Sequence, residues 1–507
     1  MGEYIEINTK DLKVGDAYAT LYEERERIAT LSLKKQPSEV TILVQAYNRL
    51  EKTKRCVESL LKYTDNVDYD LWLIDNGSTD GTLEYFQSVP YEKKNILHLT
   101  DNKGAAIPFQ FLNFGMLSEY VVSLANDLVL TKDWLKNLLI VAKSDPQIGM
   151  VNPMSSNVSN YQDPFLKFAD EEDMQKKAAE FNVSDPRKWH ERLRLVTLGT
   201  LYTKECFYAI GFPYVDVGFA HNFGDDDLTF RVRRAGYKAI LAGDTWIHHD
   251  DVKTQYTEEQ AVRFNQDLEI GRQNFIEKYN GIDAWEDVNN YINEYIRELK
   301  PADDTGKEKV LGINVRCGTP ILEIKNHIKK FDVFETECFA HTSDSKFYQD
   351  LQEVCGTDHV TVGPAEDFSR FYGPETFDHI VFGDPINKYE KYERIIEDAY
   401  RCLKPGGQIF LSIYNTQNVF DLMVCLGQYH VQNPEHAYNI SIDELANWLA
   451  AKGISSHFII ARKFETVGQA DQLEKLAKQI IQALDVGDKN TCLYRLFAQY
   501  FYIVLTK

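Results

Sequence analysis

The sequence predicts an α/β protein with two unlike domains, each built around a mainly parallel sheet. Its 507 residues are too many for one ordinary hydrophobic core. Short segments rich in β-branched residues alternate with helical segments twice along the chain, which is the order of parallel strands joined by crossover helices. The polar segment "KPADDTGKEK", residues 300–309, separates the two runs and is the best linker in the chain.

The composition is that of a globular protein and argues against several classes of partner. Hydrophobic residues make up 44% of the chain and charged residues 26%. The net charge of −21 disfavours nucleic acid or an anionic membrane as the main partner. The eight cysteines are scattered without a CxxC pair, which favours buried free thiols and no zinc site. Neither a signal pattern nor an apolar run of about 18 residues occurs, so we expect a cytoplasmic protein without a membrane span.

The elements of the first domain follow one another as strand, helix and strand. The segment "EVTILVQAYN" predicts a strand, "RLEKTKRCVESLLKYT" a helix, and "YDLWLIDNGSTDG" a second strand that ends in a polar turn. Ligands of parallel sheets bind at the carboxyl ends of the strands. We therefore expect Asp75, Asn102 and Asp127 to lie together at that edge.

The remaining chain completes a four-part organisation. Apolar residues at three-to-four spacing make "EEQAVRFNQDLEIGRQNFIEKY" helical. After the linker, "KVLGINV", "FDVFET" and "FDHIVFGD" predict strands, and "LYRLFAQYFYIVLTK" a closing strand. The chain therefore divides into an N-terminal helical extension at 1–39, a first α/β domain at 40–255, a helical segment and linker at 256–307, and a second α/β domain at 308–507.

Several motifs of the first domain occur in a characteristic order and spacing. They are "VQAYNRLEKTKRCVESLL", "LIDNGSTDGT", "DNKGAAIPFQFLNFGM", "LANDLVLTKDWL", "FGDDDLTFRVRRAGYKAI" and "WIHH". Together they resemble the family 2 glycosyltransferases, which have the GT-A fold with a mixed, mainly parallel sheet. The resemblance implies an enzyme of the kind used in bacterial glycan biosynthesis, with a nucleotide-sugar donor that is most often a UDP-sugar.

The resemblance also assigns a nucleotide-sugar site. Asp75 would contact the nucleobase at the end of the second strand, and the "NKGAA" loop would approach the donor. Gly104 in that loop has a second interpretation, because a glycine also serves a simple turn. The residues that the resemblance places in the nucleotide-sugar site are Ala46, Tyr47, Asn48, Asp75, Asn102, Gly104, Asn126 and Asp127.

A divalent cation would neutralise the departing diphosphate, and such an ion prefers hard oxygen ligands. By the resemblance, Asp127 is the last acid of the Asp-x-Asp metal motif, whose first acid is replaced here by Ala125. The ion, Mn or Mg, would then rely on the diphosphate, on water and on a later histidine. His248 is the preferred match and His249 the other, although a histidine in a surface turn explains the same letters.

The acidic run Asp225, Asp226 and Asp227 supplies the candidates for catalysis. Adjacent carboxylates repel one another, so at least one pKa rises and suits a general base, but acids are also favoured at a helix N-terminus. The resemblance places Asp225 on the base position and Asp227 in a capping or orienting role. It also implies inversion by direct attack of the acceptor. The segment "GFPYVDVGFAHNFG" would line the acceptor side or simply pack.

The second domain resembles the class I methyltransferase fold, which is Rossmann-like, most clearly at "LKPGG" before a strand. Its cofactor loop departs from the family pattern Asp-x-Gly-x-Gly-x-Gly, because Gly312 takes the acidic position and Pro320 the last glycine. Because a glycine-rich loop lets the backbone approach the cofactor, we expect weak or absent binding of S-adenosylmethionine. The residues that could still touch this cofactor are Gly318, Glu335 or Glu337, and Asp367.

Three hypotheses follow. The first is an inverting, metal-dependent glycosyltransferase with a degenerate methyltransferase-like domain, acting on a glycan, protein or small-molecule acceptor. The second is a bifunctional enzyme that also methylates with S-adenosylmethionine, and the third is a non-catalytic nucleotide-sugar-binding protein. None of them involves nucleic acid, and the sequence leaves a homo-oligomer open.

Overall fold

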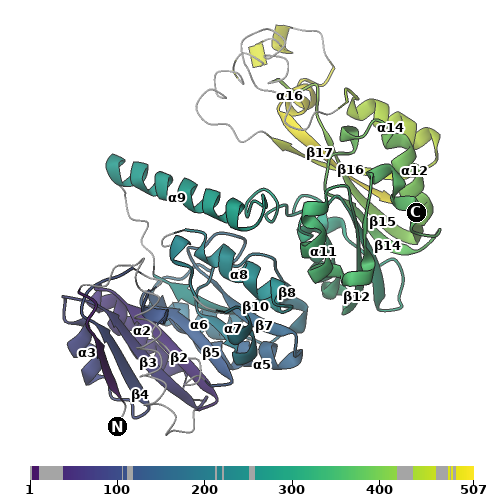
Figure 1. The fold of residues 1–507 in the computed structure, drawn as a ribbon. Coiled ribbons are helices and arrows are strands. Elements are labelled where there is room, and N and C mark those ends of the chain that lie inside the picture. Colours follow the sequence, from purple (N-terminus) through teal and green to yellow (C-terminus); the bar gives the residue numbers. More distant parts are fainter. Residues whose placement is uncertain are drawn as a thin grey trace. The chain divides into compact units, whose positions relative to one another are not determined.

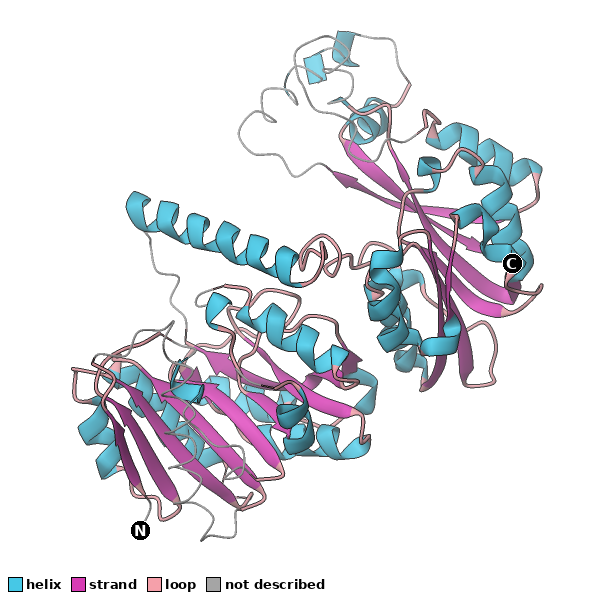
Figure 2. Ribbon diagram, viewed as in Figure 1, coloured by secondary structure: helices cyan, strands magenta, loops and turns pink. Residues whose placement is uncertain are grey.

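The computed structural model describes residues 3–10, 38–64, 66–104, 107–110, 118–211, 214–219, 222–250, 257–419, 438–463, 475, 478–479, 481–483 and 487–507. The chain forms two compact units, Met1–Asn289 (unit 1) and Asn290–Lys507 (unit 2), and each has its own sheet (Figures 1 and 2). Most of the predicted extension at 1–39 lies outside the described residues. Its described start contains a strand.

Unit 1 is built on a ten-stranded sheet in the order β1-β4-β3-β2-β5-β9-β7-β10-β6, with β8 also paired to β10. Its strands are β1 (Tyr4–Ile7), β2 (Val40–Ala46), β3 (Tyr69–Asn76), β4 (Lys94–Leu99), β5 (Tyr120–Ala125), β6 (Leu128–Val129), β7 (Ile148–Ser155), β8 (Trp189–Glu191), β9 (Thr200–Thr203) and β10 (Lys238–His249).

Strand directions in this sheet bring distant segments to one edge. Neighbours from β1 to β5 are parallel, β9 is antiparallel to both β5 and β7, and β7 is parallel to β10. Two reversals restore the direction, so β7 and β10 run the same way as β2, β3, β4 and β5. The carboxyl ends of these six strands and the amino end of β9 therefore share one edge, the carboxyl edge of unit 1. The sheet is mixed and mainly parallel, as predicted.

Helices cover both faces of this sheet. The helices of unit 1 are α2 (Leu50–Tyr63), α3 (Thr82–Ser88), α4 (Ile107–Gln110), α5 (Trp134–Ser144), α6 (Glu171–Phe181), α7 (Lys204–Ala209) and α8 (Gly224–Arg234), with the short helices η3 (Pro186–Lys188) and η4 (Val217–Phe219). The long helix α9 (Glu258–Lys278) packs on α8 and η4 instead of on the sheet. Successive residues of β2 point to opposite faces. Accordingly Ile42 packs in the core beneath α2 and α5, and Leu43 in the core that contains Val232 of α8.

Unit 2 has a seven-stranded sheet in the order β13-β12-β11-β14-β15-β17-β16. The strands are β11 (Lys307–Ile313), β12 (Glu335–Thr342), β13 (Val360–Val362), β14 (Phe377–Phe382), β15 (Leu403–Tyr414), β16 (Ser455–Lys463) and β17 (Ala498–Thr506). All pairings are parallel except those of β17, which is antiparallel to β15 and β16. This confirms the Rossmann-like α/β architecture and a closing strand, although the strand begins at Ala498 and the residues before it, predicted as strand, end helix α16.

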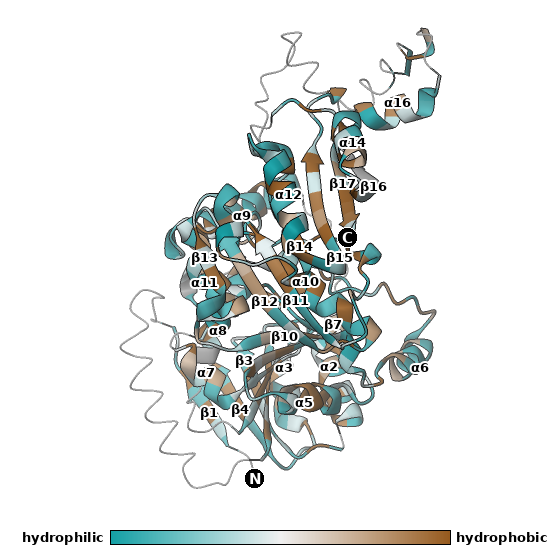
Figure 3. Cartoon of the chain, turned by 90° about the vertical axis from the view of Figure 1, so that its right-hand side faces the viewer, coloured by the Kyte–Doolittle hydropathy of each residue, from teal (hydrophilic) through white to brown (hydrophobic). Residues whose placement is uncertain are grey.

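Most helices of unit 2 lie between consecutive strands of its sheet, and its core is apolar. The helices of unit 2 are α10 (Thr319–His327), α11 (Tyr348–Cys355), α12 (Tyr392–Cys402), α14 (Ile442–Ala451) and α16 (Lys489–Leu496), with η5 (Ile296–Glu298), η6 (Ile328–Phe331), η7 (Ser345–Phe347), η8 (Thr357–His359), η9 (Ala365–Arg370) and η10 (Ile386–Lys388). Strands such as β15 and β17 concentrate hydrophobic residues (Figure 3). Among the described helices of the whole chain, none has the length and apolarity needed to cross a bilayer. The described cysteines are free thiols, and all but Cys492 are buried.

Candidate active site

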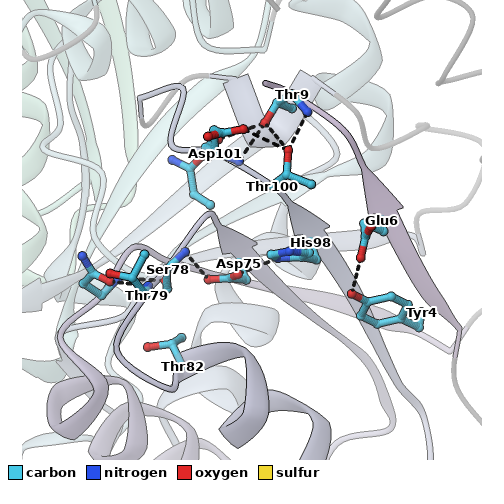
Figure 4. A network of polar contacts seen from close by, with 12 residues as sticks. Tyr4, Glu6, Thr9, Asp75, Ser78, Thr79, Thr82, His98, Thr100 and Asp101 are labelled. Carbon is cyan, nitrogen blue, oxygen red and sulfur yellow. Dashed lines mark hydrogen bonds and ion pairs between the residues drawn. The ribbon is translucent and has the colours of Figure 1, made fainter. Parts of the chain in front are cut away.

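The predicted nucleotide-sugar residues gather at the carboxyl edge of unit 1. Asp75 is the penultimate residue of β3 and is fully buried. Its Oδ2 lies 2.7 Å from Nδ1 of His98 on β4, and its Oδ1 accepts a hydrogen bond from the Ser78 backbone N–H at 3.2 Å (Figure 4). A buried carboxylate requires such partners. His98 therefore fixes Asp75 at the place where the resemblance puts a nucleobase.

The turn after β2 is joined to the turn after β3. Asn48 donates its backbone N–H to Oγ of Ser78 at 2.9 Å, and its side-chain Oδ1 accepts from the Thr79 N–H at 2.9 Å. Asn48 has a left-handed backbone conformation, with φ 54°, which asparagine tolerates. Ala46 is buried at the end of β2, while Tyr47 is 46% exposed. Tyr47 therefore offers a ligand an exposed aromatic surface in this turn.

The "NKGAA" loop is held by Asn76. The Asn76 side-chain amide donates to Oδ1 of Asn102 and to the carbonyl of Gly104, each at 3.0 Å. A Cβ at Gly77 would lie 2.5 Å from the backbone of Asp101, so only glycine lets the two turns approach this closely. Asn102 and Gly104 are both exposed. The loop therefore starts from a fixed base at the carboxyl edge.

Asn126 supports the turn that carries Asp127. Its amide donates to the carbonyl of Asn48 at 3.1 Å and to Oγ1 of Thr53 on α2 at 2.9 Å. Both donor hydrogens of the side chain are thus used within the protein. In this arrangement Asn126 positions Asp127 next to α2, and its side-chain oxygen is the atom left for the predicted contact with the donor.

Asp127 faces one histidine and one arginine. Its Oδ1 is 3.7 Å from Nε2 of His249, and its Oδ2 is 3.3 Å from Nη1 of Arg49. Burial raises the pKa of Asp127, but the interaction with His249 and the charges of Lys52 and Arg49 outweigh it and hold the pKa below its ordinary value. Asp127 is therefore ionised at neutral pH.

His249, and not His248, is the histidine beside Asp127. The two are consecutive on β10, so their side chains point to opposite faces. His248 bonds to Oγ of Ser156 at 2.6 Å and lies 5.2 Å, edge on, from the ring of Phe168. The preference for His248 as the metal ligand does not fit this geometry.

Asp127 and His249 together fit a cation that has other ligands as well. Their carboxylate oxygen and imidazole nitrogen are suitable donors for Mn or Mg. Among the described residues, His249 Nδ1 is buried and has no hydrogen-bond partner. The other ring nitrogen, Nε2, faces Asp127, so the carboxylate is the group that orients this ring. Within the same part of the chain, no three His, Cys, Asp or Glu residues converge on one point. A cation here would need oxygens from a ligand or from water.

The acidic triplet divides into three different environments. Asp226 is buried and paired with Arg194. Asp227 is fully buried and is contacted by Arg231 Nε at 2.9 Å, Tyr279 Oη at 2.6 Å and Lys278 Nζ at 2.6 Å. Because Tyr279 and Lys278 belong to the end of α9 and its cap, Asp227 joins α8 to α9. These contacts give Asp226 and Asp227 structural partners.

Asp225 differs because its side chain is held by a neutral hydroxyl. It is partly exposed and accepts a hydrogen bond from Oγ1 of Thr197. Burial raises the pKa of Asp225 to about 6, helped by the negative charge of Asp226 and opposed by Thr197 and Arg194. Thr197 precedes β9, whose amino end lies at the carboxyl edge. Asp225 is thus placed at the same edge as Asp127.

This pKa makes the pH dependence of the reaction predictable. If Asp225 acts as a base, its ionised fraction increases as the pH rises through about 6. We expect kcat/KM to fall about tenfold for each pH unit below about 6 and to level off above it. Initial rates in overlapping buffers measure this profile. A flat profile between about pH 5 and 7 would contradict the assignment.

Some site residues carry no sequence signal. Thr197 and Arg194 hold two of the three acids, yet "RLRLVTLGT" contains no recognisable motif. His98 is paired with Asp75 only through the register of β3 and β4. Contacts between residues so far apart in the sequence can be identified only from the structure of the sheet.

Asn314 connects the strand ends at the carboxyl edge of unit 2. Its Nδ2 donates to Tyr389 Oη at 2.7 Å and to Asp384 at 3.3 Å, and its Oδ1 accepts from the Ser343 N–H at 2.8 Å. One side chain thus links the ends of β11, β12 and β14. A Cβ on Gly383 would lie 2.2 Å from the Asn314 carbonyl, so the backbone is also tightly packed here.

Of the predicted cofactor residues of unit 2, Gly318 and Asp367 lie at that edge and the two glutamates do not. Gly318 is there, at the N-cap of α10 with φ 106°, and Asp367 is in η9, paired with Arg370 at 3.0 Å. Glu335 lies at the opposite, amino end of β12 and pairs with Lys307 at 2.7 Å. Glu337 pairs with Lys309 at 2.8 Å two residues later. Both glutamates therefore lie away from the carboxyl edge, where a ribose-binding acid is expected.

The topology of unit 1 is that of the GT-A class of glycosyltransferases. Residues 41–211 match the model of a family described as glycosyl transferase family 2. This part of the chain is accordingly a family 2 glycosyltransferase domain, as the sequence motifs indicated. No curated protein matches the chain in a sequence search.

Solved structures similar to the chain include glycosyltransferases and methyltransferases. A mannosyltransferase from Pyrobaculum calidifontis in complex with GDP-Man and Mn²⁺ is 20% identical, with 51% of this chain and 73% of that chain covered and a TM-score of 0.35. GalNAc-T7 with UDP, GalNAc and Mn²⁺ is 13% identical over 43% and 44% (TM-score 0.33). A SAM-dependent methyltransferase from Archaeoglobus fulgidus is 14% identical over 46% and 99% (TM-score 0.30). The glycosyltransferase character of unit 1 therefore follows from the family match and from the strand topology.

Proposed function

We propose that the protein is an inverting, cation-dependent glycosyltransferase that moves a sugar from a nucleoside diphosphate donor, with UDP-sugars as the first candidates. The acceptor is a hydroxyl of a glycan, protein or small molecule. The observation that carries the proposal is the position of Asp225, a partly exposed carboxyl held by a neutral hydroxyl, at the same sheet edge as the Asp127–His249 pair.

Asp225 would act as the general base. Near neutral pH it is ionised, because its pKa is about 6, and Thr197 holds one of its oxygens. In the transfer step the proton of the acceptor hydroxyl passes to Asp225. The acceptor oxygen forms a bond to the anomeric carbon while the bond to the diphosphate oxygen breaks, which inverts the centre. Asp226 and Asp227 keep α8 in place for this step.

Asp127 and His249 would hold the divalent cation, which supplies positive charge to the departing diphosphate. With Ala125 in place of the first acid, the protein contributes few ligands. Arg49 contacts Asp127 and its side chain is 58% exposed. Guanidinium groups bind phosphate oxygens readily. We infer that Arg49 exchanges its contact with Asp127 for one with the diphosphate when donor and cation bind.

A thermal-shift panel tests this donor site. We expect at least one of UDP, GDP, CDP and dTDP, with Mn²⁺ present, to raise the melting temperature, since a ligand that binds only the folded state stabilises it. Mn²⁺ alone should have a much smaller effect, because the site lacks a full set of protein ligands. A panel without any diphosphate-dependent shift would contradict the proposed donor site and point to a different ligand.

Unit 2 is proposed to be a scaffold that does not use S-adenosylmethionine. Asn314 already satisfies the polar groups at the strand ends, and Glu335 lies at the wrong end of β12. We expect isothermal calorimetry of the full chain with S-adenosylmethionine at millimolar concentration to show no binding heat. Saturable heat would instead support the bifunctional hypothesis. A parallel titration with S-adenosylhomocysteine, the product of methyl transfer, tests whether unit 2 binds the product instead of the cofactor.

A further inference from the structure

The segment between β7 and α6 carries two prominent exposed aromatic side chains. We call residues 156–168 the aromatic loop. Phe165 is 79% exposed and Tyr161 is 61% exposed. A single exposed apolar residue is ordinary on a protein surface. Phe165 and Tyr161 differ from ordinary exposed residues in the backbone conformation of their loop and in the way the loop is anchored.

Both aromatic residues have a left-handed backbone. Phe165 has φ 56° and Tyr161 has φ 55°, and Asn157 and Asn160 in the same loop also have positive φ. Asparagine enters this region at low cost, but large aromatic residues seldom do, because the left-handed conformation brings their Cβ close to the backbone. Strained residues of this type cluster at ligand-binding sites. The loop therefore holds its aromatic rings outward at a cost in stability.

Internal hydrogen bonds maintain this conformation. Asp163 accepts the backbone N–H of Asn157 at 2.9 Å on one oxygen and that of Phe165 at 2.7 Å on the other. The buried Gln162 accepts the Ser155 N–H on its backbone carbonyl at 2.9 Å. The position of the Phe165 backbone is thus fixed by the loop itself.

One side of the loop is attached to the segment that holds the acids. Asn160 donates to the carbonyl of Arg194 at 2.6 Å. The Gln162 side chain accepts from the Val196 N–H at 2.7 Å and donates to its carbonyl at 3.0 Å. Arg194 pairs with Asp226, and Thr197 bonds to Asp225. The loop and the proposed base are therefore both hydrogen-bonded to the segment 194–197.

The other side of the loop is attached to the end of β10. Asn157 donates to the carbonyl of His249 at 2.9 Å, and the His249 N–H donates to Oγ of Ser156 at 3.0 Å. Phe168 at the end of the loop packs on the ring of His248. The aromatic loop is thus attached at one end beside the proposed cation-binding histidine and at the other to the segment that supports the proposed base.

We propose that Phe165, together with Tyr161, forms a stacking platform for a sugar ring, so that the acceptor is a glycan. This inference rests on the proposed function and narrows its acceptor class. The faces of a pyranose ring present C–H groups, which bury favourably against an aromatic face, while the sugar hydroxyls stay in water.

A glycan array tests the inference. The full chain is applied with UDP and Mn²⁺, and again with GDP and Mn²⁺, beside the variants Phe165→Ala, Phe165→Trp and Phe371→Ala. Phe371 is a 53% exposed phenylalanine of unit 2 and serves as the matched control. We expect wild type and Phe371→Ala to bind the same glycans, Phe165→Ala to bind them about tenfold more weakly, and Phe165→Trp to restore binding. Absence of glycan binding by wild type, or equal binding by Phe165→Ala, would overturn the proposal.

Two further measurements distinguish a failure of the platform from a failure of the transferase, and a glycan contact from a membrane contact. Donor turnover by wild type, measured without acceptor and with the bound glycan as acceptor, tests the proposed function alone: turnover without glycan binding refutes only the platform, whereas glycan binding with no turnover under either condition refutes the transferase. Cosedimentation with phosphatidylglycerol vesicles tests a membrane contact. If wild type binds vesicles and Phe165→Ala does not, Phe165 is a membrane contact and the platform is refuted. If neither sediments, the glycan assignment stands.

Discussion

Replacement of Asp225 by asparagine is expected to reduce sugar transfer by about 10²- to 10⁴-fold, the usual contribution of a general base. Asparagine has nearly the same shape and can still accept the hydrogen bond of Thr197 through its amide oxygen. It cannot take a proton from the acceptor. The effect should therefore fall on kcat, with donor affinity little changed, and initial-rate kinetics with thermal shifts measure both.

Asp133→Asn is the matched control for this change. Asp133 has φ 60°, which asparagine tolerates, and it lies before α5, outside the proposed site. It loses the same single charge. Equal rates for wild type and Asp225→Asn would show that the base lies elsewhere. A large loss in Asp133→Asn as well would show that net charge, and not a specific carboxylate, determines the rate.

Replacement of Asp127 by asparagine is expected to cost about 10²- to 10³-fold in turnover, a typical loss when a group that stabilises the developing charge is removed. The same variant should lose the Mn²⁺-dependent binding of the nucleoside diphosphate. Asp127 is the only acid of the motif that the chain retains, and it holds a negative charge against His249 and Arg49. Calorimetry with Mn²⁺ in the presence and absence of UDP measures the loss directly.

The chain offers a matched pair of histidines for the same experiment. His249→Ala should resemble Asp127→Asn, because His249 is the ring beside that carboxylate. His248→Ala should lower stability through the loss of Ser156 and Phe168 contacts, yet keep the cation dependence. If His248→Ala abolishes cation binding while His249→Ala does not, the assignment from β10 is wrong.

Sequence periodicity predicted the strands and the sheet edge well, because these signals are local. Asp75 and Asp127 follow apolar runs, and both lie at the carboxyl edge. The choice between His248 and His249 could not be made in this way. Successive strand residues face opposite sides, and only the pairing of β10 with β6 shows that His249 is opposite Leu128, next to Asp127.

The errors in unit 2 have a similar physical origin. The segment "FDVFETECFA" contains two glutamates near a strand, but β12 begins at Glu335, so its carboxyl end is seven residues further along. Strand boundaries are the least certain part of a prediction from sequence. Asn314 gave no signal either, because its partners Ser343, Asp384 and Tyr389 come from separate parts of the chain.

Unit 1 is proposed to turn over a nucleotide sugar with a cation held by Asp127 and His249 and a base at Asp225. Release of nucleoside diphosphate from UDP-, GDP-, CDP- and dTDP-sugars tests this proposal, with Mn²⁺ or with excess chelator, for wild type, Asp127→Asn and Asp225→Asn. We predict release from at least one donor by wild type with Mn²⁺, and little with chelator or from either variant. Release that neither the chelator nor the two substitutions affect would refute the proposed cation site and base together.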